Sequence, residues 1–324
     1  MLKRIVPALA GAFLLVSILS AGIAQEFPNR PVRLVVPWPP SGNVDITART
    51  VAPAFAEALG QQVIVENRAG ASGRIGTEMV VKAPADGYTL MLGSTATISA
   101  GPAVFKGLSF DPAKDLVAIG PIQSAPMVLT AALKTPAASY EEFVALARKK
   151  GGQLSIASPG NGTTNHLAIE LLMRIANVKL LHVPYKGSGP AITDLLGSQV
   201  DAMMDQLAAS IGHIREGRIR AIALASARRS PLLPNVPTFD ELGVKGYSAD
   251  TFTGIFVPAG VPAPVVARLN EALRKAMANE GVRERYRSMG VDVMDMSQAD
   301  FAAYVRADYE KWRRVAREGN IVVE

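Results

Sequence analysis

The chain has 324 residues, no cysteine, and 34 basic against 28 acidic residues, a formal net charge of +6. The lack of cysteine excludes disulfide bonds and thiolate metal sites, so the packed core alone must stabilise the fold. The basic residues are spread along the chain and form no cluster with aromatic residues, which argues against nucleic-acid binding.

Residues 1–24 have the parts of a secretory signal peptide. A basic start at Lys3 and Arg4 precedes an almost unbroken apolar run over residues 5–20, and small residues then lead to Ala24. The run is shorter than a membrane-spanning helix requires, which favours a cleaved signal over a membrane anchor. We expect export to the periplasm with cleavage near Ala24. The remaining chain has 32 basic and 28 acidic residues, a net charge of +4 that mildly favours anionic ligands.

The mature chain, about 300 residues, is long enough for two α/β domains with buried cores. Apolar runs typical of strands alternate with helical patterns, which predicts mainly parallel sheets covered by helices. The expected strands are residues 32–36, 63–65, 88–92, 154–157, 179–184, 200–204 and 219–225.

Proline and capping residues indicate where several helices begin or change. Pro53 lies within the first helical pattern and is expected to kink or shorten that helix. Pro264 is expected to begin a later helix, and residues 297–300 form a capping box before the last one. The last helix carries Phe301 and Trp312 on one apolar face, which we interpret as a packing face.

Two long apolar stretches, residues 118–133 and 219–227, stand apart from the alternating units. A chain that leaves one α/β lobe, builds a second and returns needs such a pair of crossing segments. We therefore predict that residues 25–124 and 240–324 form lobe 1 and that residues 125–239 form lobe 2.

Two loops each follow a strand, contain proline, glycine and serine, and precede a helix. The first is residues 37–43, before a helix that begins near Val44, and the second is residues 158–162, before a helix that begins at Thr163. A helix N-terminus presents unpaired backbone N–H groups and a partial positive charge, so such loops favour a carboxylate or phosphate. The same residue types also serve as ordinary turns. Their recurrence favours two anion-binding helix ends at one cleft.

Motifs for metal, nucleotide or nucleophilic chemistry are absent from the sequence. The three histidines lack metal-ligand spacing, and there is no G-x-S-x-G elbow, P-loop or dinucleotide fingerprint. We therefore expect no cofactor and no metal. The sequence does not exclude general acid–base catalysis by carboxylates that come together in the fold. The candidates are Asp45, Asp194, Asp201 and Asp205. Asp205 follows a strand at the end that faces ligands in open α/β sheets, with a solvated or capping carboxylate as an equal alternative.

Segments along nearly the whole mature chain resemble one family, the solute-binding proteins of tripartite tricarboxylate transporters, also called Bug proteins. The resemblance rests on residues 37–45, 66–73, 86–90, 111–115, 160–163, 166–167, 182–187, 194–197, 236–238 and 257–260. It implies a two-lobed α/β periplasmic binding protein of type II, in which each lobe is a mainly parallel sheet with flanking helices. It also implies that the lobes close on a small carboxylic acid or related metabolite in the cleft and deliver it to transmembrane permease subunits.

The resemblance also implies which residues contact the ligand. The first loop would hold one end through backbone N–H groups and ordered waters, and the second would hold the far carboxylate. The implied contacts are Ser41, Gly42 and Asp45 in the first loop, and Gly162, Thr163 and Thr164 in the second.

The chain departs from the family where the variable part of the ligand would lie. Ser41 stands where a second glycine is usual, and residues 94–99 replace a segment that commonly holds histidine or asparagine. Trp38 replaces a usual phenylalanine and is interpreted as packing against the lobe, with stacking on an aromatic acid as the alternative. The further candidate ligand contacts are Trp38, Ser94, Thr95, Tyr185 and Asp205.

These features favour a periplasmic receptor, expected to be a monomer, that captures an organic acid for a tripartite permease. A binding protein that reports to a sensor kinase would have the same cleft and stays an alternative. A hydrolytic enzyme that uses Asp45, Asp205 and Tyr185 is a third hypothesis, although no motif supplies a nucleophile. The ligand stays open among mono- and dicarboxylates, aromatic acids and their amides, and amino acids, because backbone donors recognise the carboxylate and not what it is attached to.

Overall fold

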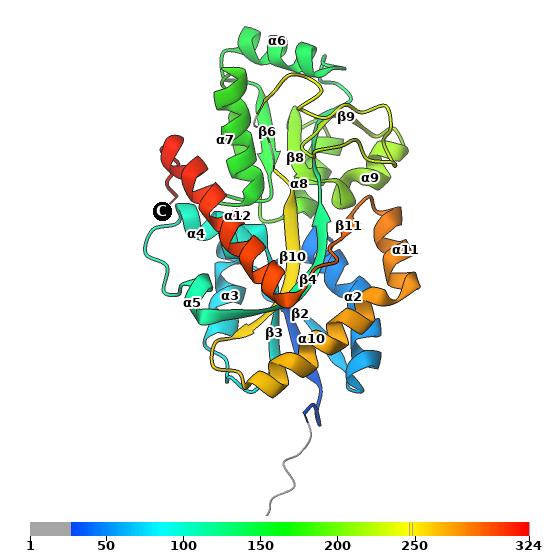
Figure 1. The fold of residues 1–324 in the computed structure, drawn as a ribbon. Coiled ribbons are helices and arrows are strands. Elements are labelled where there is room, and N and C mark those ends of the chain that lie inside the picture. The colour runs from blue at the N-terminus through cyan, green and yellow to red at the C-terminus, as the bar shows by residue number, and fades with distance from the viewer. Residues whose placement is uncertain (1–26, 246, 248, 324) are drawn as a thin grey trace, which may run out of the picture.

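The computed structural model describes residues 27–245, 247 and 249–323, and it shows two β-sheets, one above the other, with helices around them (Figure 1). The predicted signal peptide and its cleavage site lie outside the described residues. Within those residues no helix combines the length and apolar character that crossing a membrane requires.

The first sheet has six strands in the order β11-β4-β10-β3-β1-β2. β1 is parallel to β2 and to β3, whereas β10 is antiparallel to both of its neighbours and β11 is antiparallel to β4. The strands are β1 Val32–Val36, β2 Val63–Asn67, β3 Thr89–Ser94, β4 Leu116–Ala125, β10 Thr251–Pro258 and β11 Asp292–Val293.

The second sheet has five strands in the order β7-β6-β8-β5-β9. β6 is parallel to β7 and to β8, whereas β5 is antiparallel to β8 and to β9. The strands are β5 Met127–Ala132, β6 Ser155–Ser158, β7 Leu181–Pro184, β8 Ala202–Gln206 and β9 Ile219–Leu224. We name each sheet with the helices packed on it the first and the second lobe.

The predicted two-lobed α/β fold is confirmed, but its sheets are mixed rather than mainly parallel. The helix-connected strands of each lobe run parallel, as βαβ units require. Strands that run in the opposite direction add the antiparallel pairs, and these are β10 and β11 in the first sheet and β5 in the second. β4 runs in the same direction as β3, because both are antiparallel to the strand β10 that lies between them.

One of the two predicted crossing segments is confirmed. β4 and β5 follow each other across Pro126 and belong to different sheets. The prediction for residues 219–227 was wrong, because β9 is an edge strand of the second sheet, and the chain re-enters the first sheet only at β10. The apolar run of β9 reflects burial within the second lobe, where Ile222 and Leu224 are almost fully buried. The lobe boundaries near residues 124 and 240 stay a prediction.

Helices cover both sheets and mostly begin and end where their capping residues indicate. α2 continues through Pro53 as far as Leu59, so this proline does not shorten the helix. The first lobe has α2 Asn43–Leu59, η1 Ala71–Gly73, α3 Arg74–Val81, η2 Ala96–Ala100, α4 Gly101–Val104, α5 Pro112–Asp115, α10 Ala263–Ala278 and α11 Glu280–Ser288. The second lobe has α6 Tyr140–Lys150, α7 Thr164–Ala176, α8 Ser188–Leu196 and α9 Leu207–Arg215.

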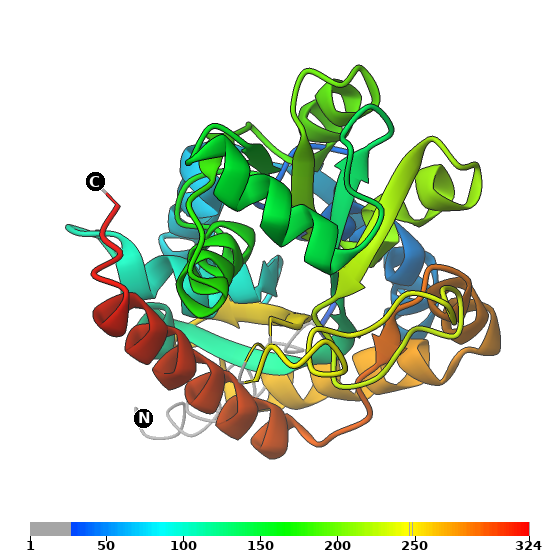
Figure 2. The same ribbon diagram turned by 90° about the horizontal axis from the view of Figure 1, so that it is seen from above.

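The last helix, α12 Gln298–Glu318, packs against both lobes along the outside of the molecule (Figure 1; Figure 2). Its predicted cap is confirmed, because the Ser297 hydroxyl accepts a hydrogen bond from the Asp300 N–H at 3.1 Å. Phe301 is fully buried against Phe252 of β10 in the first lobe. Trp312 is fully buried in the core cluster that contains the second sheet. The helix therefore joins the two cores on the side of the molecule that it covers.

Candidate functional site

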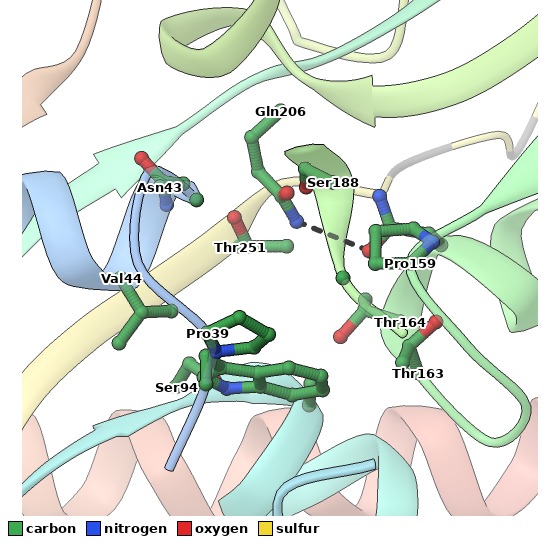
Figure 3. A pocket seen from close by; sticks show the side chains of 15 residues that line it. Pro39, Asn43, Val44, Ser94, Pro159, Thr163, Thr164, Ser188, Gln206 and Thr251 are labelled. Carbon is green, nitrogen blue, oxygen red and sulfur yellow. Dashed lines mark hydrogen bonds between the residues drawn. The ribbon is translucent and has the colours of Figure 1, made fainter. Parts of the chain in front are cut away.

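A cavity with about 500 Å³ of empty space lies between the two lobes (Figure 3). The first lobe contributes Trp38, Pro39, Gly42, Asn43, Val44, Ser94, Ala96 and Thr251. The second lobe contributes Pro159, Thr163, Thr164, Asn165, Gly187, Ser188 and Gln206. This figure includes space that is open to solvent.

Three helix N-termini meet at this cavity: those of α2, α7 and α8. Their caps are Gly42, Thr163 and Gly187, and all three residues line the cavity. Figure 3 shows Asn43 and Val44 of α2 on one side and Thr163 and Thr164 at α7 on the other. Each helix end brings unpaired N–H groups and a partial positive charge, so their convergence favours an anion.

The start of α2 keeps its backbone N–H donors, because no side chain in the described part of the chain caps it. The first hydrogen bond of the helix runs from the Ile46 N–H to the Gly42 carbonyl, so the N–H groups of Asn43 and Val44 precede the helical ladder. At α7 the Thr163 hydroxyl accepts from the His166 N–H at 3.2 Å and donates to the Gly160 carbonyl at 2.8 Å. The Thr163 side chain is thus used within its own loop.

Buried polar atoms without a protein partner gather at the same cavity. Among the described residues, Trp38 Nε1, Ser94 Oγ and Thr164 Oγ1 make no hydrogen bond although each atom is buried. An unsatisfied buried polar group costs about 1–3 kcal/mol. A ligand that contacts Ser94 of the first lobe and Thr164 of the second would remove that cost at both.

The charge of the cavity comes from backbone dipoles, because its lining contains no charged side chain. Asp205 lies directly behind three lining residues and is fully buried. Burial raises the pKa of Asp205 to about 7, although hydrogen bonds from Gln206, Ser188 and Asn165 act in the opposite direction. This carboxyl group therefore changes its protonation state close to neutral pH, where an ordinary aspartate is fully ionised.

Glycines of the second lobe contact the first lobe at the rim of the cavity. A Cβ atom at Gly187 would lie 2.9 Å from Cγ of Pro39, and one at Gly162 would lie 2.3 Å from the ring of Phe105. Both glycines have positive φ, 116° and 70°. The lobes thus approach more closely than any larger residue would allow, and the structure describes a closed arrangement.

The structure brings five of the predicted site residues to the cavity lining: Trp38, Gly42, Ser94, Thr163 and Thr164. Trp38 also packs against the core of the first lobe, so the predicted packing role is compatible with its place at the cavity.

Asp45 and Ser41 do not line the cavity but form a brace behind it. Asp45 is almost fully buried and accepts hydrogen bonds from the Ser41 N–H, the Arg49 Nε and the Asn67 Nδ2. Burial opposes ionisation of Asp45, but these hydrogen bonds outweigh it and hold its pKa below the usual value. The brace fixes the loop that leads into α2.

The remaining predicted residues do not line the cavity, and each makes hydrogen bonds within the structure around it. Thr95 Oγ1 accepts from the Phe252 N–H at 2.9 Å and ties η2 to β10. Gly162 donates its N–H to Nδ1 of His166 at 3.1 Å. The Tyr185 hydroxyl donates to Asp194 at 2.6 Å. The carboxylates and the tyrosine of the hydrolytic hypothesis thus each have other partners and do not line one cavity.

The sequence predicts a helix from Gly189 and Pro190 to Gly197, but sequence reasoning did not assign its start, or the polar residues beside it, to the site. Asn165, Ser188 and Gln206 line the cavity, and Gln206 Nε2 donates to Asn165 Oδ1 at 3.2 Å (Figure 3). The loop before α8 covers residues 185–187 between β7 and the helix, and glycine, serine and proline stand at the helix start in Gly187, Ser188 and Pro190, as they do in the other two loops. That local signal was available in the sequence.

Comparisons with known proteins agree with this geometry. The family model described as "Tripartite tricarboxylate transporter family receptor" matches residues 47–321. BugT of Bordetella pertussis is 33% identical over 313 residues, which cover 96% of each chain.

Two solved structures of Rhodopseudomonas palustris proteins are also similar. MatC, solved with bound malate, is 34% identical with a TM-score of 0.86, covering 89% of this chain and 99% of its own. Rpa4515, solved with adipate, is 32% identical with a TM-score of 0.88, covering 92% of this chain and 99% of its own.

Proposed function

Because this chain belongs to the tripartite tricarboxylate transporter receptor family, we propose that it captures a small organic acid in the periplasm and delivers it to a membrane permease. The observation that carries this proposal is the convergence of three helix N-termini from both lobes on a cavity without charged side chains. Such a site suits an anion bound by backbone dipoles and neutral hydroxyl groups.

The proposed ligand bridges the lobes. One carboxylate of the ligand would accept hydrogen bonds from the N–H groups at the start of α2. The other end of the ligand would contact the starts of α7 and α8. MatC and Rpa4515 were solved with malate and adipate, two dicarboxylates, so we take these acids as first probes. Only a ligand that contacts both lobes shifts an open receptor toward the closed form.

A thermal-shift screen tests the proposal. The mature protein, a monomer in our proposal, is mixed with malate, adipate and aromatic monocarboxylates, and with a neutral sugar and an organic amine as controls. At a ligand concentration of about 100 times Kd, binding contributes about 2.7 kcal/mol and raises Tm by about 5 °C. A shift with acids alone supports the proposal, and a shift with the sugar or amine but with no acid contradicts it.

Delivery to a permease needs a separate experiment in cells. Uptake of a labelled acid that binds the purified protein is measured in the source organism with and without the gene for this chain. Loss of uptake that returns with the gene supports transport. Unchanged uptake with altered transcription in response to the acid would favour the sensor-kinase alternative.

A further inference from the structure

Asp205 is a buried acid immediately behind the second-lobe side of the cavity. Its Oδ1 accepts from the Gln206 N–H at 2.8 Å, the Ser188 hydroxyl at 3.1 Å and the Asn165 Nδ2 at 3.4 Å. Those three residues line the cavity. The other oxygen, Oδ2, is buried and has no partner among the described residues. Oδ1 thus accepts three hydrogen bonds from residues of the cavity lining, whereas Oδ2 accepts none within the described residues.

No cation compensates Asp205 within the described part of the chain, where it forms no ion pair. β5 and β6, which pair with β8, carry no ionisable side chain, and Asp201 at the other end of β8 is bound by Lys150. The ionisable groups on the helices packed against β8 have other partners or face solvent: His166 and Glu170, Arg174 with Glu318, Asp194 with Tyr185, His213 with Arg218, and exposed Arg215.

An ionised Asp205 would therefore be a second anion at the helix ends that we propose for the ligand. A carboxylate with one bare, buried oxygen is costly without a paired charge. A ligand carboxylate on the other side of Ser188 and Asn165 adds like-charge repulsion, and no side chain in the lining screens it.

We propose that Asp205 couples ligand binding to proton uptake, so that the receptor holds an organic acid only when Asp205 is protonated. The inference rests on the proposed function, because it requires an anion in the cavity. The proton comes from solvent and stays on the Asp205 carboxyl group, and no bond of the ligand changes.

The direction of the pH dependence follows from linkage. Burial places the pKa of Asp205 at about 7 in the ligand-free protein, and the bound anion raises this pKa further. Below both pKa values the group is protonated in both states, and affinity does not depend on it. Between them binding takes up one proton, so affinity falls by up to about tenfold for each pH unit of increase.

Isothermal titration of wild type, Asp205→Asn and Asp194→Asn with adipate and with malate tests this inference. Asp205→Asn keeps an oxygen for the three donors and mimics the protonated group. Asp194→Asn removes a carboxylate of the same lobe that lies outside the lining. The series runs from about pH 6 to about pH 9, and at about pH 7.5 the titration is repeated in HEPES and in Tris buffer, which differ in heat of ionisation and avoid phosphate as a competing anion.

We expect the Kd of wild type and of Asp194→Asn to rise about tenfold per pH unit above neutrality, with a binding heat that differs between the buffers. Asp205→Asn should show a constant Kd and the same heat in both. If Asp205→Asn does not fold, the difference in the binding heat of wild type between the two buffers tests whether binding takes up a proton. If an acid binds with constant Kd and no buffer effect, the coupling is wrong and the receptor function stands. If neither acid nor any other in the screen binds, both fail.

Discussion

Gly187 at the start of α8 approaches Pro39 of the first lobe so closely that a Cβ atom on Gly187 would lie 2.9 Å from Cγ of Pro39. The contact joins the loop before α2 to the loop before α8, and both loops line the cavity. Closure of the lobes therefore depends on the absence of a side chain at one position of the rim.

Gly187→Ala should hold the lobes apart and weaken binding of the acid by about tenfold, because the added methyl group meets a rigid ring. Small-angle scattering should show a larger radius of gyration for the liganded variant than for liganded wild type. Gly217→Ala is the control for alanine at positive φ without a contact, since a Cβ at Gly217 has no atom within 4 Å, and thermal unfolding of Gly187→Ala measures the added strain at its φ of 116°. Equal affinity and radius in both variants would show that the contact does not limit closure.

Thr164→Val should lower affinity by about five- to thirtyfold with little change in Tm. Its hydroxyl is buried at the cavity and has no partner among the described residues, so the substitution removes a group that only the ligand would engage. Calorimetry and thermal unfolding on the same sample measure both effects. An unchanged Kd would show that the Thr164 hydroxyl does not contact the ligand.

Thr163→Ala should behave differently from its neighbour. The Thr163 hydroxyl caps α7 through the His166 N–H, so its loss should cost about 1 kcal/mol of folding stability. Affinity should fall less than in Thr164→Val, because the hydroxyl already has partners in the loop. Chemical denaturation gives the stability difference, and full stability of the variant would contradict the capping role.

Asp45→Asn should destabilise the loop before α2 and weaken binding indirectly. The variant loses the charge that Arg49 and the Ser41 N–H contact, which should cost about 1–3 kcal/mol of stability at neutral pH. The contribution of wild-type Asp45 is present above its unfolded pKa and is lost as the pH falls through its lower folded pKa. Denaturation of wild type and Asp45→Asn at neutral and acid pH measures the free energy of unfolding of each protein. If the difference between the two proteins is as large in acid as at neutral pH, the prediction is wrong.

Acid should destabilise the second lobe through a stacked histidine pair. The rings of His166 and His182 lie 4.2 Å apart, and Ser158 contacts His182 at 2.6 Å. Burial, with His166 as a smaller cause, lowers the pKa of His182 to about 4. The unfolded chain takes up the proton first, so stability is lost as the pH falls from about 6.5 to about 4. His182→Gln should lose less stability over that interval, and an equal loss would assign the acid sensitivity elsewhere.

Local patterns predicted most of the fold, and tertiary relationships account for the errors. The strand at residues 32–36 and the capping box at Ser297 were predicted correctly, because periodicity and capping are local signals. β9 was misread as a crossing segment, since an apolar run reports burial and not which sheet the strand joins.

The candidate site was predictable only where it is built from continuous loops. The starts of α2 and α7 were found from their loop residues. The start of α8 with Ser188 carries a similar loop signal, but Asn165 and Gln206 meet Ser188 only because β6, β7 and β8 end at the same edge of one sheet, and no spacing in the sequence indicates that meeting. The brace on Asp45 depends on Asn67, 22 residues away, and the sequence does not indicate this contact.

The central claim is that helix ends in both lobes bind a carboxylate, and titration of an acid against its own amide tests it most directly. The acid with the largest thermal shift, adipate if it binds, is compared by calorimetry with its uncharged diamide, which keeps the chain length and removes both charges. We predict saturable binding of the acid and a loss of at least about a hundredfold in affinity for the diamide, because the helix ends favour the anion. Equal affinity for the acid and the diamide would contradict the account.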